Sequence, residues 1–95
     1  MQLVIKEQQY FSLLDEDHFF SWLQRIAGVS GITGTPQGLA VTLEATQFTD
    51  ESLHDLLALH ARYHLDMRQL AQFETPENSR WFRNAEAFWH QQVFG

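Results

Sequence analysis

His60 and His64 have the spacing most suggestive of chemistry in this chain, because residues four apart share one face of a helix. Two imidazoles placed in this way can bind zinc if Asp66 or His90 supplies a third ligand. In the metalloprotease motif a glutamate follows the first histidine, whereas here Ala61 does. A metal-dependent enzyme is therefore one hypothesis. The competing interpretation makes His60 a buried histidine on an apolar helical stripe, hydrogen-bonded to a neighbour, and predicts no metal and no cofactor.

A second group of chemically capable residues lies along one edge of a predicted helix. His18, Trp22 and Arg25 occupy positions i, i+4 and i+7. Tryptophan and arginine are common anchors of protein interfaces, so this edge is a candidate partner-binding surface. The alternative, which the pattern favours, is an amphipathic helix whose polar flank covers the rim of the core.

Nucleophilic and phosphate-binding motifs are absent from the sequence. No serine lies in a Gly-x-Ser-x-Gly nucleophile elbow. The glycine-dense stretch 28–34 follows a predicted helix and lacks the Gly-Lys-Ser/Thr signature of a phosphate loop. The sequence therefore predicts a protein that is not an enzyme, with no catalytic residues.

The C-terminal segment is rich in aromatic residues, with Trp81-Phe82 and Phe88-Trp89 as two doublets. Aromatic and arginine side chains can stack on bases or on methylated cations, but nearby glutamates offset Arg80 and Arg83. Packing on the core explains the same residues more simply. The part of this segment that we expect to stay accessible to a partner consists of Arg80, Arg83 and part of Trp89.

The overall composition narrows the possible functions. The chain has 95 residues, no cysteine and a net charge of −6, with twelve acidic residues against six Lys and Arg. This balance disfavours nucleic acid as a partner. The apolar run at the N-terminus breaks at Lys6 and Glu7, too early for a secretory or membrane segment. We expect a cytoplasmic protein that does not bind membranes.

Hydrophobic periodicity and turn residues predict the order of elements. We expect a strand at 2–6, a helix capped by Asp15, a left-handed residue at Gly28, and a hairpin whose first arm is an edge or bulged strand. A second helix runs from Thr49 to about Tyr63. Residues 67–73 fit either a helix or an edge strand. Thr75 and Pro76 restart a helix that Asn84 interrupts, and a last helix covers 85–94.

This order predicts an α+β fold of the β-α-β-β-α split type. The sheet is small and mostly antiparallel, its third strand lies between the first and second, and both helices cover one face. The two helices then run in opposite directions, which puts their acidic N-termini at opposite ends. We expect one domain over 1–95, with a core at 1–66 and an aromatic helical clamp at 75–95.

The chain resembles a family of small uncharacterised bacterial proteins with a Trp-Phe…(Tyr/Phe)-Trp…Val-Phe-Gly ending. The resemblance rests on residues 19–23, 70–73 and 81–95, although Phe88 stands where tyrosine is expected. Proteins of this kind look like immunity or accessory proteins. The leading hypothesis is therefore a small non-catalytic protein that binds a partner protein, of an immunity or inhibitor type. The alternative is a structural or regulatory homodimer that uses the C-terminal segment or an unpaired sheet edge.

Overall fold

A computed structural model describes all 95 residues and confirms an α+β fold. The elements, in chain order, are β1 (Gln2–Ile5), α1 (Leu13–Arg25), β2 (Val29–Thr35), β3 (Gly38–Leu43), the 3₁₀ helix η1 (Ala45–Gln47), α2 (Asp50–Arg62), the 3₁₀ helix η2 (Arg68–Phe73), α3 (Ser79–Phe82) and α4 (His90–Phe94).

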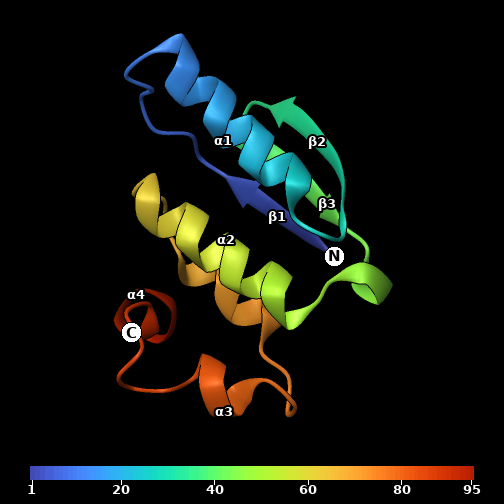
Figure 1. Cartoon of the computed structure of the whole chain (residues 1–95), viewed down its shortest axis with the longest axis vertical. Coiled ribbons are helices and arrows are strands. Elements are labelled where there is room, and N and C mark those ends of the chain that lie inside the picture. Colours follow the sequence, from blue (N-terminus) through green and yellow to red (C-terminus); the bar gives the residue numbers. More distant parts are fainter.

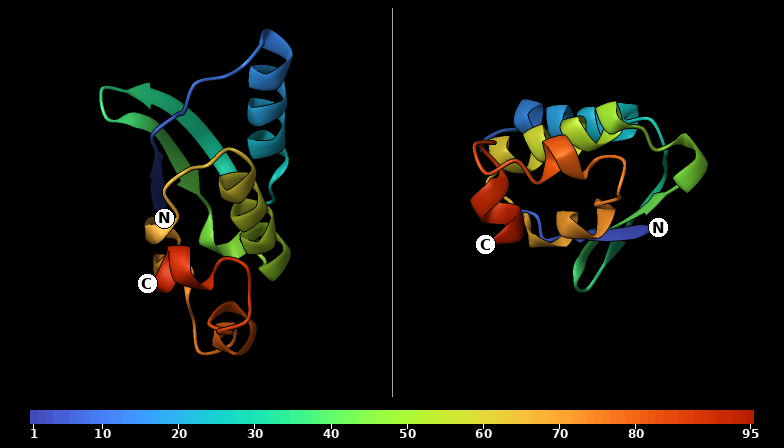
Figure 2. Two further views of the ribbon diagram at one scale, coloured as in Figure 1. Left: turned by 90° about the vertical axis from the view of Figure 1, so that its left-hand side faces the viewer. Right: turned by 90° about the horizontal axis from the view of Figure 1, so that it is seen from below.

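The three strands form an antiparallel sheet in the order β1-β3-β2, as the split arrangement requires (Figure 1). Helices α1 and α2 lie side by side on one face and run in opposite directions (Figures 1 and 2). Their N-termini are therefore at opposite ends of the helical layer. The alternating residues Leu39, Val41 and Leu43 of β3 point toward these helices and are buried.

Helix α1 begins earlier than the sequence predicted, because Ser12 rather than Asp15 is its cap. The Ser12 hydroxyl accepts a hydrogen bond from the Asp15 N–H at 3.1 Å. The Asp15 carboxylate accepts one from the Phe11 N–H at 2.9 Å. Asp15 therefore lies in the first turn of the helix rather than before it. Its carboxylate bonds back to the residue before the cap, and its negative charge complements the helix dipole. Thr49 caps α2 as predicted, through a reciprocal capping box with Ser52.

The hairpin of β2 and β3 carries the irregularities that its glycines suggested. Gly28 has the predicted positive φ, at 98°. The register between β2 and β3 shifts between Val29 and Gly31, which makes β2 a bulged edge strand. Gly38 has a φ of 136°, and a side chain there would collide with the Ile5 carbonyl of the neighbouring strand. Only glycine fits this close approach of two backbones.

Residues 68–73, which the sequence left open between helix and strand, form the 3₁₀ helix η2 beside β1. The side-chain amide of Gln69 pairs with the edge of β1. Its Oε1 accepts from the Val4 N–H at 3.0 Å, and its Nε2 donates to the Val4 carbonyl. A single side chain therefore takes the place of a fourth strand at this edge.

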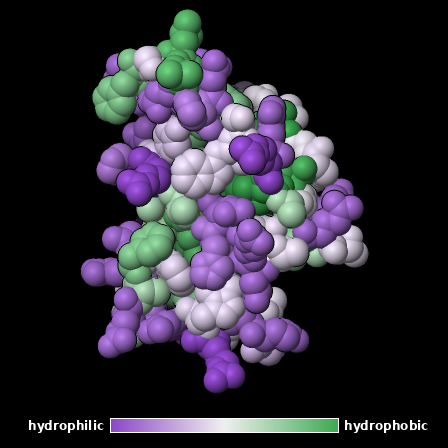
Figure 3. Space-filling model, viewed as in Figure 1, coloured by the Kyte–Doolittle hydropathy of each residue, from purple (hydrophilic) through white to green (hydrophobic).

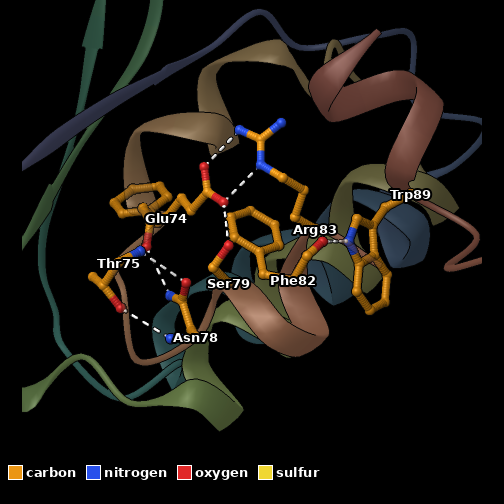
Figure 4. Close-up of polar contacts among 8 residues, drawn as sticks. Glu74, Thr75, Asn78, Ser79, Phe82, Arg83 and Trp89 are labelled. Atoms are coloured by element: carbon orange, nitrogen blue, oxygen red, sulfur yellow. Dashed lines mark hydrogen bonds and ion pairs between the residues drawn. The ribbon is translucent and has the colours of Figure 1, made fainter. Parts of the chain in front are cut away.

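Thr75 begins a turn (Figure 4), whereas the helix that was predicted to start at Pro76 begins only at Ser79, and the last helix is shorter than predicted. The Thr75 hydroxyl accepts from the Asn78 N–H at 3.2 Å, and the Asn78 side chain accepts from the Thr75 N–H at 2.8 Å. The predicted helix over 85–94 is reduced to α4. Asn84 accepts from the Glu86 N–H at 2.9 Å, and residues 85–89 form turns instead.

One cluster of 19 buried apolar residues joins the sheet, α1, α2 and the C-terminal segment. Phe82, Trp89 and Val93 belong to this cluster together with Leu3 and Val41. None of the helices combines the length and the apolar character needed to cross a lipid bilayer.

Candidate functional site

Most aromatic side chains of the C-terminal segment are packed against the rest of the chain and are not exposed. Trp89 is only 8% exposed, and its indole N–H donates to the Phe82 carbonyl at 2.7 Å. Phe82 is completely buried. Trp81 is half-buried and stacks on His54 of α2, with ring centroids 4.2 Å apart. Most of the surface that these rings could offer to a partner is therefore already used within the chain.

The two arginines of this segment differ in how firmly they are held. Arg83 makes two hydrogen bonds to Glu74, at 2.8 and 2.6 Å (Figure 4). Its guanidinium also lies over the Phe94 ring. The Arg83 guanidinium and then the Ser79 hydroxyl lower the pKa of Glu74 to about 2. Arg80 is exposed and makes no ion pair. Arg83 thus joins two parts of its own chain, while Arg80 remains accessible.

The edge formed by His18, Trp22 and Arg25 is brought together as the helical spacing predicts. These side chains line a shallow, polar depression, and its opposite wall consists of Glu51 and Asp55 from α2. Trp22 is half-buried and reaches toward the neighbouring cleft described below. The depression has a polar floor and no deep apolar recess for an anchoring side chain.

The two histidines of the metal hypothesis are separated by the end of α2. His60 is 1% exposed, and its Nδ1 lies 2.7 Å from the Leu56 carbonyl, as expected of a buried histidine. Burial lowers the pKa of His60. His64 lies beyond the helix with a φ of 55° and is exposed. Asp66 is paired with Arg68. No three His, Asp or Glu side chains gather closely enough to hold a metal ion.

A cleft with a volume of about 510 Å³ lies between the N-terminal end of α1 and the C-terminal end of α2. Its walls are mainly aromatic, formed by Tyr10, Phe19, Trp22 and Tyr63. Phe19 is the floor of this group, with ring centroids 5.6 Å from Tyr10 and 5.0 Å from Tyr63. We call this the aromatic cleft. Its position follows from the antiparallel helices, which bring residues 48 positions apart into contact.

Three bulky apolar side chains at the start of α1 are exposed to solvent, and the first of them, Phe11, also lines the aromatic cleft. Phe11 is 92% exposed, Leu13 80% and Leu14 66%. We call these three residues the apolar rim. Figure 3 shows a hydrophobic area at the end of the molecule where α1 begins. Five large hydrophobic side chains of the chain are exposed in all, so three of them lie within four consecutive residues.

Carboxylates surround this region. The Tyr10 hydroxyl donates to Glu7 at 2.6 Å, and burial together with Glu7 raises the pKa of Tyr10 well above its usual value. Glu16 contributes to the same shift. Burial, followed by the charge of Asp15, raises the pKa of Tyr63. On the far wall of the cleft Arg62 supplies a positive charge. The site combines an apolar centre with a predominantly acidic border.

The sequence reasoning missed the apolar rim, although a signal for it was present. Ser12 and Asp15 have the S-x-x-D spacing of a helix start. A helix that begins there places Leu13 and Leu14 about 120° and 140° away from the buried stripe that contains Phe19, and therefore in solvent.

Comparison of the chain with protein-family models, with curated proteins and with solved structures finds no match.

Proposed function

We propose that this chain is a small non-catalytic bacterial protein that binds a partner protein through the apolar rim and the aromatic cleft. The observation that carries the proposal is the exposure of Phe11, Leu13 and Leu14, together with the aromatic cleft that Phe11 also lines. Contiguous exposed apolar groups next to a concave aromatic surface are characteristic of protein interfaces.

The same surface favours a partner with basic residues around an apolar anchor. Glu7, Asp15 and Glu16 lie within or next to the site, and the whole chain has a net charge of −6. Such a border speeds encounter with a basic surface. This chemistry suits an immunity-type inhibitor of a basic protein. A chain without cysteine suits a reducing compartment, and we propose that it acts in the cytoplasm.

Affinity capture with a variant series tests this proposal. The Phe11→Ser/Leu14→Ser double variant removes exposed side chains and should leave the fold intact, while Phe88→Ser is the matched control because Phe88 is 62% exposed elsewhere. Wild type and control should retain the same partner, in particular the product of an adjacent gene when co-expressed. The double variant should bind it at least about tenfold more weakly.

Equal retention by the double variant would exclude the apolar rim as the binding surface. Failure of every form to retain any protein, including the product of the adjacent gene, would remove the support for a protein-binding function.

A further inference from the structure

The two edges of the sheet are not equivalent, because a side chain occupies part of one edge and the other is open. At β1, the outward N–H and carbonyl of Val4 are both bonded by Gln69. At β2, no side chain or loop group bonds to the backbone of Ile32 or Gly34. Open edges are where a further strand can be added to a sheet.

The pairing pattern shows that Ile32 and Gly34 direct their backbone groups away from the sheet. The Leu43 N–H donates to the Met1 carbonyl at 2.8 Å, so Leu43 and its alternate residues in β3 bond toward β1. The intervening Ala40 therefore bonds toward β2, where its partner is Thr33. Because bonding direction alternates along a strand, the residues on either side of Thr33 point outward.

The open edge also lacks the features that usually prevent strand addition. Residues 29–38 contain no charged side chain, although the chain has 18 charged residues. The bulge near Ser30 is the one feature of β2 that hinders strand addition, and it lies at the end of β2 that is far from the turn. Figure 2 shows that the turn end of the β2–β3 hairpin bends away from the helical layer, so another strand can reach its edge.

We propose that β2 pairs antiparallel with β2 of a second copy of this chain, across a two-fold axis at Thr33. Ile32 then faces Gly34 of the second copy, and Gly34 faces its Ile32. Each of these two pairs exchanges both N–H···O bonds. The two Thr33 side chains meet on the face without helices, where threonine pairs are favourable.

Two observations favour a second copy over another protein at this edge. The strand matches itself: no atom lies within 4 Å of the position where Gly34 would carry a Cβ, so there is room above it for the Ile32 side chain of the other copy. The second observation is that a second copy would meet little charge repulsion at this edge. Two copies with a net charge of −6 each repel through most of their surface, whereas this edge brings no charged side chain of the strand into the contact.

The contact is short, so the dimer should dissociate on dilution. Dimerisation would produce a continuous sheet with all helices on one face and would leave the apolar rim, at the start of α1, free for a different partner. This inference is thus independent of the proposed function.

Sedimentation equilibrium from about 10 µM to 1 mM tests the proposal, together with hydrogen exchange of single amides by NMR. The wild type should show a reversible monomer–dimer equilibrium, and the Ile32 and Gly34 amides should exchange more slowly as concentration rises. Gly34→Pro removes an outward N–H that the monomer does not use, and edge strands tolerate such a proline. It should weaken the dimer at least tenfold. Gln2→Pro, at the start of the other edge strand, is the matched control and should leave the dimer unchanged.

If Gly34→Pro does not fold, Thr33→Glu replaces it, because two carboxylates would then meet at the two-fold axis. A wild type that stays monomeric throughout the range overturns the proposal. So does a dimer that survives both substitutions, or one that is lost only in the Phe11→Ser/Leu14→Ser variant, which would assign self-association to the apolar rim.

Discussion

The burial of His60 predicts how the stability of the protein depends on pH. Its pKa in the folded state lies below the unfolded value of 6.5, since burial disfavours the charged imidazole more than the Leu56 carbonyl and Asp66 favour it. Below pH 6.5 the unfolded chain therefore binds a proton that the folded chain does not. The contribution of neutral His60 is complete above pH 6.5 and is lost as the pH falls below it.

The size of this effect follows from proton linkage. Where the folded-state pKa lies below the range, titration of one unfolded histidine lowers the free energy of unfolding by about 1 kcal/mol between pH 6.5 and 5.5. The well-paired carboxylates do not interfere. The pKa of Asp66, like that of Glu74, is held at about 2 by its arginine partner, so their contributions are lost only as the pH falls from about 4.

Urea unfolding at pH 7.5, 6.5 and 5.5, followed by tryptophan fluorescence, measures the effect. His60→Leu should reduce the pH dependence in this range by up to about 1 kcal/mol, because leucine fills a similar volume and does not titrate. His64→Asn is the matched control, since His64 is exposed and asparagine accepts its positive φ. Identical pH dependence in wild type and His60→Leu would refute the assignment of a buried neutral imidazole.

Three further predictions concern stability and can be measured by the same denaturation assay. Phe82→Ala should cost about 3–5 kcal/mol because its ring is completely buried, whereas Phe88→Ala should change stability by less than about 0.5 kcal/mol, and equal losses would contradict the packing described. Gly38→Ala should destabilise strongly through its positive φ and the collision with β1, while Gly34→Ala should be tolerated in the monomer; the reverse order would contradict the hairpin geometry. Ser12→Ala should cost about 1 kcal/mol as the loss of a helix cap, and no change would argue for a cap elsewhere.

The sheet and the two main helices could be predicted from sequence because their signals are local and agree with one another. Alternation at Leu39, Val41 and Leu43 identifies a half-buried strand, and Thr49 marks the start of a helix. The order of the strands then follows from rules of chain connection rather than from any single residue.

The C-terminal third was harder to predict because tertiary contacts determine it. Residues 68–73 form a 3₁₀ helix beside β1, and Gln69 makes its contact with a residue 65 positions away. Residues 85–89 leave the helical conformation where Asn84 takes the Glu86 N–H and where Trp89 bonds the Phe82 carbonyl. No local pattern specifies such partners.

The candidate site was missed for a different reason, since its residues were all visible in the sequence. Asp15 has the residue type of a cap, and the choice of Asp15 over Ser12 left Phe11 and Leu13 outside the predicted helix. A difference of three residues in one helix start determines which face of the helix Leu13 and Leu14 occupy, and hence that they are exposed.

The pairing of Gln69 with Val4 also has a consequence for how the chain matures. A ribosome makes β1 first and Gln69 only after both other strands and two helices, so the nascent sheet has two open edges for most of its synthesis. Contacts over 65 residues form slowly, and unpaired edges aggregate in the meantime. Gln69→Ala should therefore reduce the yield of soluble protein during rapid expression more than it lowers the melting temperature of the purified chain.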